Sequence, residues 1–242
     1  MKVSYDGLNN VDNNRGFTMI EFLVALAVGS IVSAVIYMAF TFQQQSWVTQ
    51  DQLATMQQNL RMSLRFVAKD LMLAGYDPQF SGLPNFVAIN ANGVSATNNT
   101  SVEFTMDLAN DAGSMAVGSS DGDIDDPGEH ISYYLQDNQL CRDDINAGIS
   151  CDVVAQNIER LLFFYIKEDG TVEANPPAGT LNDIRLVRAV ILARTNAVIT
   201  NYTGSQTFVY IDQNGVNISE TFNDNRRRLL LAMNVNCRNK GL

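Results

Sequence analysis

Three groups of side chains in this sequence have types and spacings suited to chemistry. Glu21 stands five residues after Gly16 and is the only charge in residues 17–42. Cys141 and Cys151 are separated by a polar segment that contains a glycine. A third group is a run of acids: Asp121, Asp123, Asp125, Asp126 and Glu129. An isolated carboxylate in an apolar segment needs a partner, closely spaced acids suit Ca²⁺, and nearby cysteines can form a disulfide.

The segment that contains Glu21 is long and apolar enough to cross a membrane. As a helix, residues 17–42 would be about 39 Å long at about 1.5 Å per residue, which exceeds the roughly 30 Å hydrocarbon core of a bilayer. A charged carboxylate in such a helix is costly unless it is hydrated or paired. Two interpretations follow: Glu21 lies at headgroup depth, or it pairs with a positive group.

The residues around Glu21 favour the second interpretation. The sequence RGFTMIEF, residues 15–22, resembles the processing site of the type IV pilin family, which includes the pseudopilins of type II secretion. The resemblance implies that a prepilin peptidase cuts after Gly16 on the cytoplasmic face and methylates the new amino terminus at Phe17. It also implies that Glu21, with Thr18, lies at a subunit contact, where Glu21 pairs with the amino terminus of a neighbouring subunit.

This resemblance divides the chain into four parts. Residues 1–16 are expected to be a leader peptide; their apolar segment follows the cleavage site, unlike that of a secretory signal. Residues 17–42 are expected to form the transmembrane and filament-core helix, and residues 43–75 its amphipathic continuation. Residues 76–242 then form a β-rich globular domain in the periplasm or outside the cell.

The sequence predicts that the helix continues well past the membrane segment. No Gly or Pro occurs in residues 43–73, and apolar residues recur every three or four positions: Leu53, Met56, Leu60, Leu64, Val67 and Leu71. Gly75, followed by Asp77 and Pro78, marks the predicted end. We expect the stripe to pack on the chain's own sheet; a coiled-coil seam is the alternative.

Two further segments narrow the family resemblance. Residues 59–76, NLRMSLRFVAKDLMLAGY, resemble PilW-like minor pilins and the J-type minor pseudopilins through Asp70-Leu71 and Ala74-Gly75-Tyr76. Residues 226–239, RRRLLLAMNVNCRN, resemble the terminal strand of the family. Many major pilins have a proline about twenty residues into the mature helix, whereas this chain has Met38 there.

Beyond the helix, short runs rich in β-branched and aromatic residues predict strands. They are Val102–Leu108, Ile131–Leu135, Leu161–Ile166, Ile184–Leu192, Thr207–Ile211 and Leu229–Val235, with turns at Asp121-Gly122, Asp169-Gly170 and Asn214-Gly215 and a surface loop at Asn90–Thr100. No second helical pattern is present to connect parallel strands. The predicted fold class is therefore α+β: a long N-terminal helix packed on one face of an antiparallel sheet, as in type IV pilins.

The cysteines and the acids each suggest one feature of the globular domain. Cys141 and Cys151 flank a segment suited to a hairpin or a loop, so a local disulfide is expected in an oxidising periplasm. Cys237 is then a buried or reduced thiol. The sole histidine, His130, has no partner at metal-ligand spacing, so we expect it to be structural or exposed. The acidic run is a candidate Ca²⁺ site, with an ordinary acidic surface loop as the alternative.

Charge and motifs exclude several functions. The net charge of −10 argues against nucleic acid as a direct partner. The basic cluster Arg226–Arg228 is expected to be a solvated strand edge. No nucleophile motif, phosphate loop or paired His and Cys ligands occur, so we predict neither an enzyme nor a small-molecule substrate.

The combined expectation is an assembly protein. The resemblance implies a minor pilin that takes part in pilus assembly or priming and enters the pilus through its N-terminal helix. Its expected partners are other major and minor pilins, the prepilin peptidase, the bacterial inner membrane and the pilus assembly platform. A minor pseudopilin of type II secretion is the related alternative. A membrane-anchored periplasmic enzyme or ligand-binding module is the alternative of another class.

Overall fold

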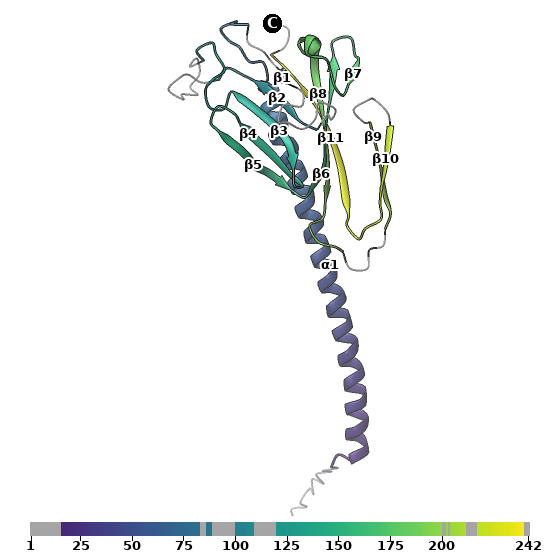
Figure 1. Ribbon diagram of the computed structural model, residues 1–242. Helices are drawn as coiled ribbons and strands as arrows, with labels where there is room; N and C mark the ends of the chain where they lie inside the picture. The colour runs from purple at the N-terminus through teal and green to yellow at the C-terminus, as the bar shows by residue number, and fades with distance from the viewer. Residues whose placement is uncertain are drawn as a thin grey trace, which may run out of the picture. The chain divides into compact units, whose positions relative to one another are not determined.

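The computed structural model describes residues 16–82, 86–88, 100–108, 120–199, 202, 204–211 and 217–239. Helix α1 runs without interruption from Met19 to Leu73 (Figure 1). The chain divides into two compact units, one that ends at Val48 and one that begins at Thr49, and α1 contributes to both. Of the predicted leader, only Gly16 belongs to the described residues.

The predicted apolar stripe of α1 is buried in the second unit. Its members Met56, Leu60, Leu64, Val67 and Leu71 are at most 5% exposed. They form one core cluster with side chains from the two larger sheets, Phe104 and Phe163 among them. The prediction that the helix packs on the chain's own strands is therefore confirmed.

The end of α1 also lies where the sequence predicts it. Gly75 has a φ of 73°, and its N–H donates to the carbonyl oxygen of Thr105 at 2.8 Å. Glycine adopts this left-handed conformation without the steric cost that a Cβ would impose, which suits it to the turn after a helix. The hydrogen bond attaches the helix end to the strand that contains Thr105.

Antiparallel strands make up most of the remaining described structure. They are β1 (Phe86–Ala88), β2 (Val102–Thr105), β3 (His130–Gln136), β4 (Gln139–Asp144), β5 (Ile149–Gln156), β6 (Ile158–Lys167), β7 (Val172–Glu173), β8 (Ile184–Arg194), β9 (Gln206–Ile211), β10 (Asn217–Phe222) and β11 (Arg228–Asn236). A 3₁₀ helix, η1 (Ala178–Asp183), precedes β8. Each run predicted to be a strand overlaps one of these elements. Strands β1, β4, β5, β7 and β10 were not predicted; β4 and β5 lie at the cysteine segment, for which the sequence predicts a hairpin or a loop.

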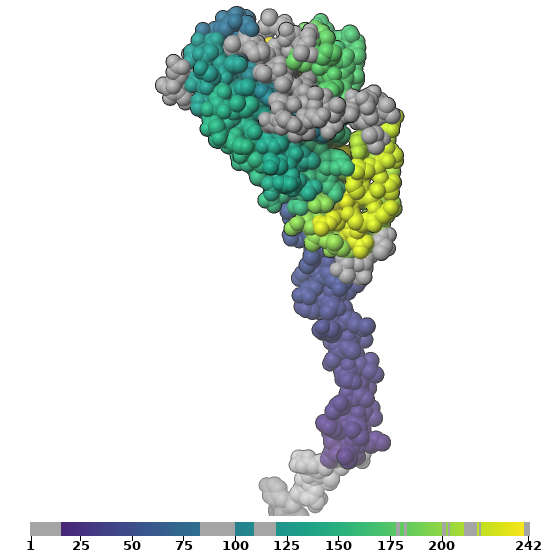
Figure 2. All heavy atoms as spheres, in the orientation of Figure 1, coloured from purple at the N-terminus to yellow at the C-terminus, as the bar shows by residue number. Residues whose placement is uncertain are grey.

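The strands form three sheets where the sequence suggested one. One sheet has the order β1-β2-β3-β4-β5, another has β11-β8-β6-β7, and β9 pairs with β10 as a hairpin. The first two sheets lie beside the C-terminal part of α1 (Figure 1). In the space-filling view, teal side chains of the first sheet and yellow side chains of β10 and β11 both reach the visible face (Figure 2). The predicted α+β class, a long helix on antiparallel strands, is confirmed.

The division between the two larger sheets follows from single residues. Asn157 alone separates β5 from β6, and its φ of 62° redirects the chain from the first sheet to the second.

Within the first sheet, Asp137 and Asn138 join β3 to β4 as a two-residue turn with φ of 49° and 59°. Asn and Asp tolerate positive φ better than other non-glycine residues, and such turns match strand twist.

Some sequence expectations lie beyond the described residues. The predicted loop at Asn90–Thr100 does so except for Thr100, and the turn at Asn214-Gly215 does so entirely. The turn at Asp169-Gly170 is present between β6 and β7, where the Gly170 N–H donates to the Lys167 carbonyl oxygen at 3.0 Å.

Candidate functional site

The predicted cleavage junction is open to solvent. Gly16, Phe17 and Thr18 come immediately before α1 and are all exposed, with Phe17 84% exposed. Apart from Gly16 itself and its two chain neighbours, no atom of the described residues lies within 4 Å of the position that a Cβ would take on Gly16. The peptide bond between Gly16 and Phe17 is therefore sterically accessible to a peptidase in this structure.

Thr18 and Glu21 form a capping box at the start of α1. The Thr18 N–H donates to Glu21 Oε2 at 3.0 Å, and the Glu21 N–H donates to Thr18 Oγ1 at 3.3 Å. The Thr18 hydroxyl also donates to Glu21 Oε2, at 2.9 Å. This reciprocal pattern satisfies backbone donors at a helix start. The family resemblance places both residues at a subunit contact and does not include this capping role, although Thr-x-x-Glu before an apolar run is its known signal.

The capping box uses one carboxylate oxygen of Glu21. Oε2 accepts both hydrogen bonds that Thr18 donates to the carboxylate. Oε1 has no hydrogen bond within the described part of the chain. Glu21 can therefore cap its own helix and still offer an oxygen to a second donor.

The N-terminal part of α1 exposes its apolar side chains. Ile20, Phe22, Ile31, Val35 and Phe42, for example, are 60% to 76% exposed. The most apolar window of eighteen residues in α1 has a mean hydropathy of 2.4 and is 0% buried. By length and composition this helix can cross a membrane, and by exposure it needs an apolar environment.

Asp70, part of the segment that resembles PilW-like pilins, joins α1 to the first sheet. Its Oδ2 accepts hydrogen bonds from the Tyr133 hydroxyl at 2.7 Å and from Arg142 Nε at 2.8 Å. Tyr133 lies in β3 and Arg142 in β4. Burial and the Asp70 carboxylate raise the pKa of Tyr133, which keeps the phenol protonated as a donor. Sequence analysis singled out Asp70 but gave it no partner.

Cys141 and Cys151 form the predicted disulfide. Their Cα atoms are 4.5 Å apart and the S–S distance is 1.99 Å. The bond joins β4 to β5, so the segment is a hairpin and not an irregular loop. Cys237 is buried and carries no disulfide.

Two of the acids predicted as calcium ligands, Glu129 and Asp123, accept hydrogen bonds from backbone groups. Glu129 accepts hydrogen bonds from the Leu108 N–H at 2.6 Å and the Asp126 N–H at 3.3 Å. Asp123 accepts from the Asp125 N–H at 3.4 Å. All five acids lie in the described part of the chain, and within that part no group of three His, Cys, Asp or Glu side chains is arranged to hold a metal ion. The Ca²⁺ site stays a prediction.

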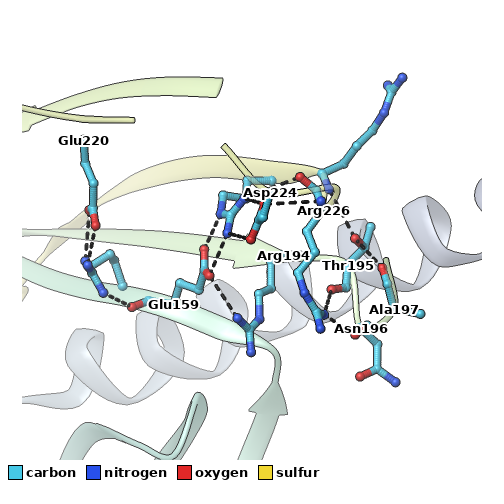
Figure 3. Close-up of polar contacts among 11 residues, drawn as sticks. Glu159, Arg194, Thr195, Asn196, Ala197, Glu220, Asp224 and Arg226 are labelled. Atoms are coloured by element: carbon cyan, nitrogen blue, oxygen red, sulfur yellow. Dashed lines mark hydrogen bonds and ion pairs between the residues drawn. The ribbon is translucent and has the colours of Figure 1, made fainter. Parts of the chain in front are cut away.

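The expectation of a solvated basic edge at Arg226–Arg228 is wrong for Arg228. Its side chain is 2% exposed and forms ion pairs with Glu159 and Asp224 (Figure 3). Arg194 also contacts Glu159, with Nη1 3.1 Å from Oε1. Although β11 is an edge strand, Glu159 on β6 places a carboxylate where Arg228 begins that strand. Burial of these charges is tolerated because each is paired.

The rest of this cluster connects the sheet to neighbouring turns. The Arg228 guanidinium lowers the pKa of Asp224 to about 2. Arg226 donates to the carbonyl oxygens of Thr195 and Asn196 (Figure 3). The charged groups are matched to one another. Together they describe a structural ion-pair network.

His130 is structural, which is one of the two roles that the sequence suggests for it. Its Nε2 lies 2.6 Å from Glu103 Oε1, which joins adjacent strands β3 and β2.

These features define a class of protein: an α+β chain in which an open Gly-Phe junction and a capped, exposed apolar helix precede the globular fold. Residues 12–37 match the family described as the prokaryotic N-terminal methylation motif. The motif predicted at the junction is thereby confirmed. Among solved structures the chain is similar to a type IV-like pilin from Thermus thermophilus, with 16% identity and a TM-score of 0.49 over 76% of this chain and 98% of that chain. No curated protein matches the sequence.

Proposed function

We propose that this chain is a PilW-like minor pilin that enters a type IV pilus through its N-terminal helix. The observation that carries the proposal is the methylation motif at residues 12–37, which leads directly into a helix with exposed apolar side chains. Such a helix needs lipid or other apolar helices around it. Assembly into a filament moves it from lipid to a bundle of apolar helices.

The junction would act in two steps. The prepilin peptidase cuts after Gly16 and methylates the amino group of Phe17. Glu21 then keeps Oε2 on its own capping box and accepts a hydrogen bond on Oε1 from the amino terminus of a neighbouring pilin. Pairing compensates both charges in an apolar surrounding, where an unpaired carboxylate is costly.

The remaining parts would serve assembly and display. Before assembly the helix anchors the chain in the bacterial inner membrane and the globular domain lies in the periplasm. Its partners are other pilins and the assembly platform. After assembly the chain is located in the pilus at the cell surface. Because Arg228, Glu159 and Asp70 are held in ion pairs that fix the fold, we infer a structural and not a catalytic role for the domain.

A minor pseudopilin of type II secretion would use the same cleavage and the same helix. The two functions differ in the machine that receives the subunit. Deletion of the gene separates them: a minor pilin predicts lost or reduced piliation with normal secretion, and a minor pseudopilin predicts the reverse.

The experiment that tests the proposal uses a strain without the prepilin peptidase. We expect the chain to keep its leader there, to migrate as the longer precursor, and to be missing from sheared pili. A chain of unchanged mass in both strains, together with normal piliation after deletion of its own gene, would instead indicate a membrane-anchored enzyme or binding module.

A further inference from the structure

A shallow groove lies between the end of α1 and the end of β11, within the unit that begins at Thr49. Its volume is about 630 Å³, and its floor is formed by apolar side chains of Met72, Leu73, Tyr76 and Met233. Met72 and Tyr76 are each 37% exposed. Methionine adapts its shape to a partner, and Met, Tyr and Arg are enriched in protein interfaces.

Three cations border this apolar floor. Arg65 and Lys69 lie one helical turn apart on α1, and Arg238 follows β11. All three are exposed, and none forms an ion pair within the described part of the chain. Several other basic residues of that part are in ion pairs, for example Arg142 with Asp70 and Arg160 with Glu220. Three cations without an ion pair therefore border a single groove.

The walls of the groove are held in place without a ligand. The Asn239 side-chain amide donates to the carbonyl oxygens of Met72 at 3.3 Å and Leu73 at 3.2 Å. The neighbouring Val235 and Cys237 are buried at 1% and 4% exposure. A groove that is already formed loses little conformational entropy on binding.

We propose that this groove docks an acidic segment of a partner protein that inserts an apolar side chain between its carboxylates. The carboxylates would pair with Arg65, Lys69 and Arg238, and the apolar side chain would cover Met72 and Tyr76. The chain as a whole has a net charge of −10, so an acidic partner is repelled by most of its surface. A local cluster of cations without ion pairs gives such a partner a complementary place.

A protein segment fits the groove better than an anionic membrane surface does. From Phe42, the end of the apolar segment, to Arg65 there is roughly 35 Å of helix at about 1.5 Å per residue. Attraction to lipid headgroups fades within a Debye length, about 8 Å at physiological salt. This step rests on the proposed function, because it takes the apolar segment as the membrane anchor. The charge and shape argument does not depend on it.

The test uses residues 49–242 once circular dichroism has shown their cooperative thermal transition, because both hydrophobic core clusters consist only of residues in that range. The probe is a short fluorescein-labelled peptide with one leucine between aspartates, and binding is followed by fluorescence anisotropy. We expect saturable binding that weakens with salt. We also expect at least tenfold weaker binding after Arg65→Glu or Lys69→Glu. Methyl NMR of the methionines should show peptide-dependent shifts at Met72 and Met233.

The matched control is Arg188→Glu, which changes the charge equally. Arg188 donates to Asn234, the neighbour of Met233 on β11, and successive strand residues face opposite sides of a sheet. We expect this variant to retain peptide binding within about twofold.

Four results would overturn the proposal. Two concern the peptide: equally tight binding of a peptide with serine in place of the leucine, and a loss of peptide binding in Arg188→Glu as large as in Arg65→Glu. The other two are groove-dependent binding to anionic phospholipid vesicles without peptide binding, and groove-dependent self-association in sedimentation. The assay needs neither the leader nor a filament. Failure here therefore leaves the processing of Gly16 untouched, and failure of processing leaves the groove untouched.

Discussion

Glu21 combines a negative charge with a helix-capping hydrogen bond, and substitution separates the two. Glutamine at this position keeps the capping box but removes the charge, whereas alanine removes both. We predict that Glu21→Gln and Glu21→Ala both lower incorporation into pili at least tenfold, measured by immunoblot of sheared filaments against membrane fractions. Thr18→Ala, which weakens the cap and keeps the charge, is the control and should retain most incorporation.

The outcome for Glu21→Gln decides between the two roles. Normal incorporation of this variant, with loss only in Glu21→Ala and Thr18→Ala, would show that the helix cap matters and that charge pairing does not.

Asp107 carries a buried charge that the fold tolerates at a cost. Its side chain is fully buried, with Oδ2 accepting from the Gly122 N–H at 3.1 Å, and Oδ1 has no hydrogen bond to any described residue. Burial, together with the negative charges of Asp121 and Asp77, raises the pKa of the Asp107 carboxyl. The folded state therefore binds this proton more tightly than the unfolded state does, and this stabilisation is lost as the pH rises through the folded pKa.

From this we predict that Asp107→Asn raises the free energy of unfolding of residues 49–242 by about 1 kcal/mol at pH 7 and has little effect near pH 3. Urea denaturation at both pH values measures it, with exposed Asp152→Asn as the control. A variant less stable than the wild type at pH 7 would contradict this assignment.

At the scale of elements, Asp70 determines how firmly α1 holds the first sheet. Asp70→Asn should lower the free energy of unfolding by about 1.5 to 3 kcal/mol, because it breaks charge-assisted hydrogen bonds to Tyr133 and Arg142. The measurement is urea denaturation of residues 49–242, with Asp51→Asn on the exposed face of the same helix as the control. Equal losses in the two variants would show that Asp70 is an ordinary surface residue.

The same scale shows where sequence reasoning succeeds. The stripe from Met56 to Leu71 has helical spacing, and that spacing alone predicts which face is buried. Short runs rich in β-branched and aromatic residues, such as Leu161–Ile166, likewise predict strands. What failed were features that depend on one residue's backbone or on a distant partner: the change of sheet at Asn157, and the pairing of Arg228 with Glu159. Local patterns carry little information about either.

At the scale of the whole molecule, stability and assembly are assigned to different parts of the chain. Both core clusters lie after residue 48, while exposed apolar surface is concentrated before it. We predict that residues 49–242 fold as a soluble unit, with a cooperative thermal transition by circular dichroism and the Cys141–Cys151 bond intact by mass mapping. A fragment without a cooperative transition would show that the first unit contributes to the core.

The central claim is that the chain is processed and used as a pilin. Mass spectrometry of the amino terminus of the protein isolated from its native cells tests this most directly. The account predicts a chain that begins at Phe17 and carries a methyl group on its amino nitrogen. A chain that still begins at Met1, or that begins at any residue other than Phe17, in cells with an active prepilin peptidase would contradict it.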